Sequence, residues 1–191
     1  MHQSFPEFIE KVFWPAVRKG WMIVGFNLPF DISRLSRRWR RSRNGGFSLI
    51  LSEQFDHKSR TWKPHPYRPE IRLDAKDART TLFTVGTPRF RKDEWPNPGR
   101  FLDVSHLLFS LFYKHMSLDQ WCAEFQRRRY AIDRKLAHEP SGKITQSELR
   151  YCRQDVKITQ QLLNAAKQEF DAHPLPNLLP DKAFSSASIC T

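Results

Sequence analysis

A six-residue apolar run at residues 21–26 (WMIVGF) constrains the fold more than any other stretch of this 191-residue chain. The run is too short for a helix and is bounded by turn-forming residues, so it predicts a strand buried on both faces. Ser4 and Glu7 form a capping-box pattern that predicts a helix before the strand, ended by Gly20. Residues 30–41 predict a second helix after it. Helix, strand and helix in this order indicate an α/β fold.

The next part of the chain is rich in β-forming residues. Residues 47–53 and 70–85 predict antiparallel strands, the latter broken by a polar turn near Lys76 and Asp77. The proline-rich residues 63–69 (KPHPYRP) between them predict an extended surface loop. We therefore expect a β-rich insertion at about residues 44–98.

The α/β pattern then resumes. Residues 101–105 (FLDVS) predict a second core strand, and residues 107–112 and 117–125 predict helices, with Ser117 as the N-cap of the second. We expect one domain over residues 1–171, followed by a tail or a truncated continuation over residues 172–191, which are rich in proline and serine.

The helix that begins at Thr145 is the best specified in the sequence. Thr145 and Glu148 fit a capping box, and Ile144 and Leu149 fit a hydrophobic staple. Apolar residues then recur every three or four positions, which predicts an amphipathic helix that extends to Phe170. The predicted apolar face consists of Leu149, Cys152, Val156, Thr159, Leu163, Ala166 and Phe170.

Charge and composition bear on the partners of the chain. A formal net charge of +12 favours a polyanionic partner, most simply nucleic acid. The three cysteines are far apart and odd in number, which favours a reducing compartment. No apolar run reaches the ~20 residues of a membrane span, and no signal peptide is recognisable, so we expect no membrane association and a cytoplasmic location.

Two aspartates stand where a functional site could form, one after a predicted strand and one on the face of a predicted helix. Asp31 follows the predicted strand at residues 21–26, and open α/β sheets bind ligands at the carboxyl ends of their strands. Tyr151 and Asp155 are four residues apart, so both project from one face of the Thr145 helix, beside its apolar stripe. Each has a plainer alternative. Asp31 could simply favour a helix dipole, and Tyr151 and Asp155 could be a solvated pair.

Taken together, these residues resemble a known family. "NLPFD" (Asn27 to Asp31) and "YCRQD" (Tyr151 to Asp155) are similar to the second and third motifs of 3′-to-5′ exonucleases that carry four acidic residues and a tyrosine. The closest likeness is to the proofreading domains of family B DNA polymerases, particularly protein-primed ones, and covers roughly residues 6 to 170. The resemblance implies a ribonuclease H-like (DnaQ-like) exonuclease fold.

The resemblance also implies a chemistry. Members of this family hydrolyse phosphodiesters with two Mg²⁺ or Mn²⁺ ions, which prefer hard oxygen ligands. By carry-over, Asp31 and Asp155 are metal ligands, and the hydroxyl of Tyr151 orients the attacking water. The resemblance implies single-stranded DNA as the substrate. By the same carry-over, Asn27 and Phe30 hold the terminal nucleotides of the strand, and Phe30 packs against a base or sugar.

Further residues are assigned to the same cleft with alternatives left open. Asp103 and Ser105 are candidate substrate contacts, or a strand-end cap for the next helix. Arg129 falls where the family places a lysine that stabilises phosphate charge, although it could belong to a solvated basic helix end. Arg34 and Arg38 open a run of six arginines that could follow a nucleic-acid backbone or form a solvated face.

One family feature is missing. The first motif, D-x-E, supplies the other two carboxylates, and this sequence contains no D-x-E. The first strands of the family sheet are also absent. The chain is therefore expected to be a fragment of a DNA polymerase or stand-alone exonuclease, with little activity alone. The alternative is a non-catalytic, basic nucleic-acid-binding module derived from this fold.

Overall fold

The computed structural model describes residues 4–42, 45–75, 81–86, 99–139, 142–173, 177–183 and 189. It is a mixed α/β structure with several sheets. The chain divides into two compact units: unit 1 comprises Met1–Val24 and Leu28–Leu102, and unit 2 comprises Gly25–Asn27 and Asp103–Thr191. The predicted turn at Lys76 and Asp77, the last arginine of the run and half of the predicted tail lie outside the described parts.

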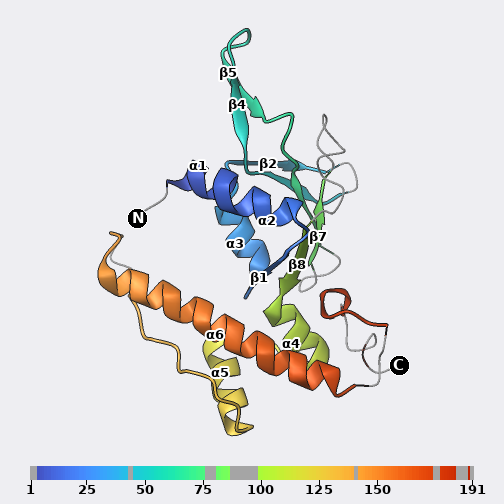
Figure 1. Ribbon diagram of the computed structural model, residues 1–191, viewed down its shortest axis with the longest axis vertical. Helices are drawn as coiled ribbons and strands as arrows, with labels where there is room; N and C mark the ends of the chain where they lie inside the picture. Colours follow the sequence, from blue (N-terminus) through green and yellow to red (C-terminus); the bar gives the residue numbers. More distant parts are fainter. Residues whose placement is uncertain are drawn as a thin grey trace. The chain divides into compact units, whose positions relative to one another are not determined.

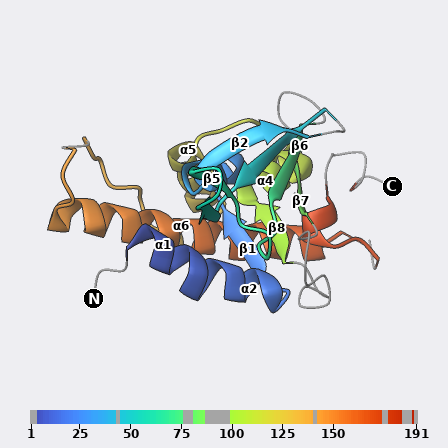
Figure 2. The same cartoon turned by 90° about the horizontal axis from the view of Figure 1, so that it is seen from above.

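Unit 1 begins with a continuous helical rod, visible in blue in Figure 2, made of α1 (Phe5–Phe8), η1 (Ile9–Phe13) and α2 (Trp14–Arg18). The predicted capping box is confirmed, because Glu7 Oε2 accepts from both the backbone N and the Oγ of Ser4 at 3.0 Å. The π-helical turn η1 lies directly before Pro15, which has no N–H to donate to the preceding turn. Gly20 ends the rod with φ of 72°.

The strand predicted at residues 21–26 forms as β1 (Met22–Gly25) and pairs with β8 (Arg100–Asp103). Burial on both faces is wrong for most of this strand. Only Gly25 is buried, and the neighbouring Trp21 is 59% exposed. Since β1 and β8 form a two-stranded sheet, few neighbours are available to cover both faces.

The helix predicted at residues 30–41 is wrong in its second half. It ends early as α3 (Leu28–Arg34), and the chain continues as β2 (Arg38–Arg41). The hydroxyls of Ser33 and Ser36 donate to backbone carbonyls three residues earlier, which competes with helical hydrogen bonding. Trp39, which lies within the predicted helix, is 61% exposed on strand β2.

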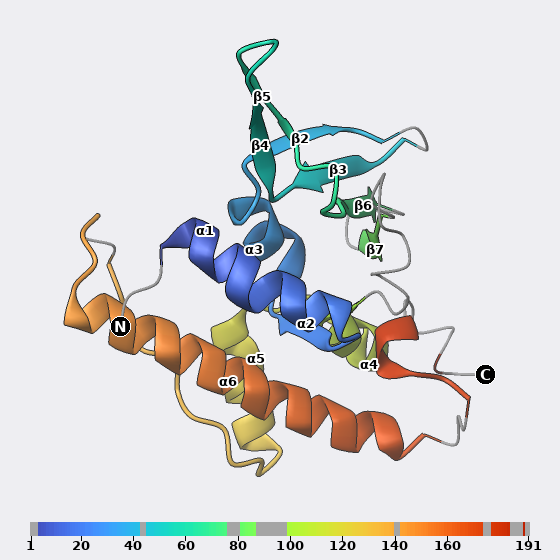
Figure 3. The same cartoon turned by 45° about the horizontal axis from the view of Figure 1, so that its top comes forward.

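The predicted antiparallel strands form a four-stranded sheet in the order β2-β3-β6-β7, with β3 (Phe47–Ile50), β6 (Ile71–Ala75) and β7 (Thr81–Val85) (Figure 3). A separate hairpin pairs β4 (Glu53–Asp56) with β5 (Thr61–Pro64). The loop predicted at residues 63–69 is therefore shorter than expected, because its first two residues belong to β5. The core of unit 1 packs this sheet against the helices through Ile9, Phe13, Trp14, Val17, Leu28, Ile32, Leu49, Leu51 and Ile71.

Unit 2 contains the ends of β1 and β8, an extended segment at residues 130–139, and helices. It contains α4 (Val104–Phe112), α5 (Leu118–Arg127) and the long α6 (Gln146–Asp171) (Figure 1). The N-caps predicted at Ser117 and Thr145 are both confirmed, each with a capping box. The predicted hydrophobic staple is wrong, because Ile144 is 84% exposed.

The apolar face predicted for α6 is also wrong in its first half. Cys152 is exposed and Val156 is 70% exposed, whereas the buried residues are Ile158, Leu162, Ala165, Ala166 and Phe170. Continued toward the N-terminus at the same helical spacing, this buried row reaches Asp155 and Tyr151. These two side chains therefore continue the packed face of α6 and do not lie beside it.

Part of the predicted tail is packed within unit 2. A short 3₁₀ turn, η3 (Pro180–Lys182), leads to Ala183, whose carbonyl accepts from Ser110 Oγ of α4 at 2.9 Å. Across the described ranges, no helix combines the length and the apolar character that crossing a membrane demands.

Candidate functional site

An extended segment, residues 130–139, lies along α6 in the antiparallel sense (Figure 1). Its successive side chains meet α6 residues of decreasing number, so the segment is held along most of the helix. The pairs are Tyr130 with Glu169, Asp133 with Gln161 and Lys157, Lys135 with Asp155, and His138 with Tyr151.

This arrangement brings four polar side chains together, which we call the α6 cluster: Lys135, His138, Tyr151 and Asp155. The ring of His138 stacks on Tyr151 with centroids 4.4 Å apart. The ammonium of Lys135 lies 5.6 Å from the centre of the Tyr151 ring and 3.9 Å from Asp155 Oδ2. A lysine is thus placed next to the tyrosine and the carboxylate of the third predicted motif.

Lys135 is held in its charged form. Burial opposes the charge and would lower its pKa, but a hydrogen bond with Tyr151 and the charge of Asp155 outweigh it, so the pKa of Lys135 is raised. The cluster borders Cys122 of α5, where burial, the largest cause, together with nearby acidic charge raises the pKa of the thiol to about 11. Cys122 is therefore a neutral packing residue rather than a nucleophile.

Asp155 carries an oxygen without a partner. Its Oδ1 is buried and accepts no hydrogen bond from any described residue. The contact between Asp155 Oδ2 and Lys135 at 3.9 Å is longer than the 2.7–2.9 Å that is typical of a charge-assisted hydrogen bond. A buried hydrogen-bond acceptor without a partner lowers the stability of the fold by about 1–3 kcal/mol. A hydrogen-bond donor or a cation bound at Asp155 Oδ1 would remove this cost.

The α6 cluster fits a metal ion only in part. The open carboxylate oxygen of Asp155 is a hard ligand of the kind that Mg²⁺ prefers, whereas the adjacent ammonium of Lys135 competes with a cation. No set of three or more His, Cys, Asp or Glu side chains within the described ranges is arranged to hold a metal ion. Asp155 can therefore supply one ligand, and a complete site needs carboxylates from elsewhere.

Sequence reasoning placed the site's cation at Arg129, whereas the cation beside Tyr151 and Asp155 is Lys135. Arg129 is exposed, with φ of 68°, where the chain leaves α5. A count along the sequence could not reveal this, since it ignores how residues 130–139 fold back along α6. The neighbouring Arg127 and Arg128 both pair with Glu124, which supports the plainer alternative of a basic helix end.

Asp103 acts as a structural cap, the alternative left open for it. Its Oδ1 accepts from the backbone N and the Oγ of Ser105 at 2.9 and 2.7 Å, at the start of α4. The same oxygen accepts from the backbone N of Asn27 at 3.0 Å. Asn27 has φ of 62°, a region that Asn tolerates better than most residues. A contact of Asp103 or Ser105 with nucleic acid stays a prediction.

The remaining candidates belong to unit 1. Asp31 is exposed in the first turn of α3, which also satisfies the plainer reading of a carboxylate near a helix N-terminus. Phe30 is 51% exposed, and the guanidinium of Arg34 lies 4.7 Å from its ring centre. Arg38 pairs with Glu53 at 2.9 Å. Asp31 belongs to unit 1 and Asp155 to unit 2.

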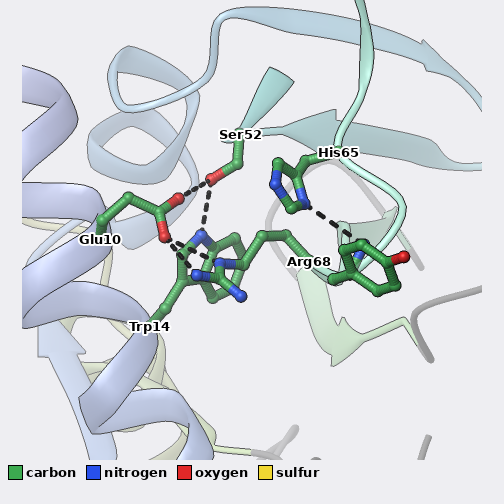
Figure 4. A network of polar contacts seen from close by, with 6 residues as sticks. Glu10, Trp14, Ser52, His65 and Arg68 are labelled. Carbon is green, nitrogen blue, oxygen red and sulfur yellow. Dashed lines mark hydrogen bonds and ion pairs between the residues drawn. The ribbon is translucent and has the colours of Figure 1, made fainter. Parts of the chain in front are cut away.

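Unit 1 contains a second polar cluster that sequence reasoning missed, the Glu10 network of Glu10, Trp14, Ser52, His65 and Arg68 (Figure 4). Arg68 donates twice to Glu10 Oε2, at 2.6 and 2.8 Å, and Ser52 Oγ donates to Glu10 Oε1 at 2.7 Å. Trp14 Nε1 donates to Ser52 Oγ at 2.8 Å. These residues are spread over positions 10 to 68 of the chain. Their spacing in the sequence follows no pattern from which the contacts could be predicted.

Comparisons of the chain with protein-family models, with curated proteins and with solved structures found no match. The function must therefore be inferred from the contacts and the charges of the site.

Proposed function

We propose that this chain is part of a 3′-to-5′ exonuclease domain of the ribonuclease H-like class that removes nucleotides from the 3′ ends of single-stranded DNA by two-metal hydrolysis. The observation that carries the proposal is the buried, unpartnered Oδ1 of Asp155 beside Tyr151 and Lys135. The side chain of Asp155 is 28% exposed, but its Oδ1 is buried, and a buried oxygen without a hydrogen bond is costly, which supports a functional role for it.

Each residue of the α6 cluster has a role in this proposal. Lys135 donates to the hydroxyl of Tyr151, because an ammonium has donors only, and the O–H of Tyr151 is then left to hold a water molecule. The positive charge of Lys135 stabilises negative charge that develops on a phosphate. His138 restricts the ring of Tyr151 by stacking on it.

In this proposal Asp155 of unit 2 and Asp31 of unit 1 each have the role of a metal ligand, and Asn27 and Phe30 each have the role of a contact to a terminal nucleotide. Mg²⁺ or Mn²⁺, when bound, stabilises the attacking and leaving oxygens of the phosphodiester. Two carboxylates bind Mg²⁺ weakly, since this ion gives up its water reluctantly, so the chain by itself is expected to have little activity.

The test supplies the missing motif. A longer polypeptide that contains this chain preceded by a strand ending in D-x-E should trim single-stranded DNA from its 3′ end in the presence of Mg²⁺. Asp155→Ala should abolish the trimming, and Tyr151→Phe should slow it about 10²-fold. Asp133→Ala is the matched control, because Asp133 pairs with Lys157 outside the α6 cluster and should leave the rate nearly unchanged. Trimming that survives Asp155→Ala would place the active site elsewhere.

A second candidate is a non-catalytic nucleic-acid-binding module. The proximity of Lys135 to Asp155 favours it, because an internal cation can replace a metal ion at a carboxylate that no longer serves catalysis. This candidate predicts binding of single-stranded DNA that weakens steeply with salt, and no trimming even after the missing motif is restored.

A further inference from the structure

Strand β2 of unit 1 has two faces of different chemistry. Side chains of an extended strand alternate between its two sides, so Arg38 and Arg40 project from one face and Trp39 and Arg41 from the other. Arg37, whose backbone N donates to Ile50 O at 2.9 Å, continues the second face. All four residues of β2 are exposed.

On the first face, acidic residues neutralise the arginines. Arg38 pairs with Glu53 at 2.9 Å, and Arg40 pairs with Glu70 at 2.6 Å through a guanidinium that contacts both carboxylate oxygens. Both glutamates are mostly buried, with 9% and 18% of the side chain exposed, so these pairs tie β2 to its surroundings. This face has little positive charge left for a partner.

The second face, which we call the open β2 face, consists of Arg37, Trp39 and Arg41, together with Phe47 on the neighbouring strand β3. Trp39 is 61% exposed and Phe47 45% exposed, with their rings 5.5 Å apart, and Phe47 is the cross-strand partner of Arg41. Among the described residues, the acidic side chains near β2 pair with Arg38 and Arg40 and not with Arg37 or Arg41. The guanidinium of Arg37 lies 5.5 Å from the ring centre of Phe5 and keeps its charge. Exposed rings and uncompensated guanidinium groups therefore share one surface.

We propose that the open β2 face binds single-stranded nucleic acid, with bases stacked on Trp39 and Phe47 and phosphates paired with Arg37 and Arg41. Aromatic rings between positive charges bind single strands without sequence preference, because every base has a π-face and every nucleotide a phosphate. The inference rests on the proposed function only in that both take nucleic acid as the ligand. Binding at this face does not require that the nucleic acid be hydrolysed.

The dimensions of the face suit a short stretch of strand. Arg37 and Arg41 are four residues apart, which corresponds to roughly 13 Å along an extended chain. That length matches about four stacked nucleotides. The charge of the chain as a whole, +12, adds an attraction of the same sign. A partner protein with an apolar surface would leave the two arginines buried without counter-charges.

The main experiment measures binding of the 191-residue chain to a fluorescein-labelled oligodeoxythymidylate of about 12 nucleotides by fluorescence anisotropy, in EDTA so that nothing is cleaved. Trp39→Ala should weaken binding about tenfold, and Trp39→Phe should restore most of it. Trp62→Ala is the matched control. Trp62 is 54% exposed on β5, outside the open β2 face, and its loss should change the affinity less than about twofold.

A pair of adjacent arginines tests the charges. Arg41→Ala should lower the slope of log affinity against log salt by about 0.7, the value for one phosphate contact on a single strand. Arg40→Ala removes the same charge from the neutralised face and should leave that slope unchanged. Circular dichroism and thermal unfolding establish that each variant is folded.

The outcomes separate this inference from the proposed function. Equal losses from Trp39→Ala and Trp62→Ala, or equal slopes for the two arginine variants, would overturn it in favour of general electrostatic binding. Unchanged DNA binding in Trp39→Ala, with loss of self-association in sedimentation, would overturn it in favour of a protein contact. Failure of trimming in the completed enzyme would refute the proposed function and leave the binding result standing.

Discussion

The Glu10 network of unit 1 and the α6 cluster of unit 2 each centre on a partly buried carboxylate, yet they differ in how fully its oxygens are satisfied. In the Glu10 network, Oε1 accepts from Ser52 and Oε2 accepts twice from Arg68. In the α6 cluster, Asp155 has one contact of 3.9 Å on Oδ2 and no partner on its buried Oδ1 among the described residues.

The difference separates a structural cluster from a candidate site. Satisfied hydrogen bonds to a charged group stabilise the fold, and Glu10, Ser52 and Arg68 come from three separate stretches of unit 1 that their contacts hold together. An unsatisfied buried oxygen does the opposite, because the fold must compensate for its cost elsewhere. We therefore expect substitutions in the two clusters to change stability by different amounts and, in places, in opposite directions.

The largest expected effect is in the Glu10 network. Arg68→Ala removes both donors to Glu10 Oε2 and should lower the free energy of unfolding by about 1–2 kcal/mol, with allowance for the partial exposure of the pair. Arg41→Ala, which breaks no ion pair, should stay within about 0.5 kcal/mol. Urea unfolding followed by circular dichroism gives both values. A loss no larger than that of Arg41→Ala would mean that the network contributes little to stability.

The next effect concerns the α6 cluster. Lys135→Met leaves the carboxylate of Asp155 without its neighbouring cation and should lower stability by about 1 kcal/mol. Asp155→Asn removes the charge and should be neutral or slightly stabilising, and the double variant should recover the loss. A double-mutant cycle measures this coupling. Added Mn²⁺ should raise the melting temperature of Lys135→Met more than that of the wild type, and equal shifts would exclude Asp155 as a metal ligand.

The smallest effect is the response of unit 1 to acid. Burial, followed by the charge of Arg68, lowers the pKa of His65 from 6.5, and the hydrogen bonds from Arg68 and Ser52 overcome burial and lower the pKa of Glu10 from 4.5. In each case the unfolded chain binds the proton first. Stability should therefore fall as the pH drops below about 6.5 through protonation of His65, and again below about 4.5 through Glu10.

Unfolding midpoints measured from pH 8 to pH 4 test this response, with a change of less than about 1 kcal/mol expected for each group. Glu10→Gln should remove the lower step and retain the upper one. A lower step that persists in Glu10→Gln would assign it to other carboxylates of the chain.

The sequence predicted the starts of helices correctly, because a helix start depends on a few neighbouring residues. The capping boxes predicted at Ser4 and Thr145 and the N-cap predicted at Ser117 all form, because the groups that bond lie three residues apart. The helix expected at residues 30–41 is wrong in its second half because β2 pairs with β3, whose partner residues lie six to twelve positions further along the chain. The apolar face of α6 was misplaced because exposed Val156 and Cys152 fit the same spacing as the buried row.

Some residues of the candidate site could likewise be predicted from the sequence, and others could not. Tyr151 and Asp155 could be found from their spacing on a helix, but Lys135 could not, because residues 130–139 reach α6 only by folding back along it. The run of arginines could be recognised in the sequence. Its division into a neutralised face and an open face could not, because it depends on ion pairs with Glu53 and Glu70, which lie further along the chain.

The sequence by itself determined where helices begin, which residues carry charge and which pairs share a helix face, because these depend on neighbours within one or two turns. Only the tertiary structure decided which carboxylate is satisfied and which is not, since a hydrogen-bond partner can come from any part of the chain. Glu10 accepts hydrogen bonds from Ser52 and Arg68, which are remote from it in the sequence. The buried Oδ1 of Asp155 accepts no hydrogen bond from any described residue.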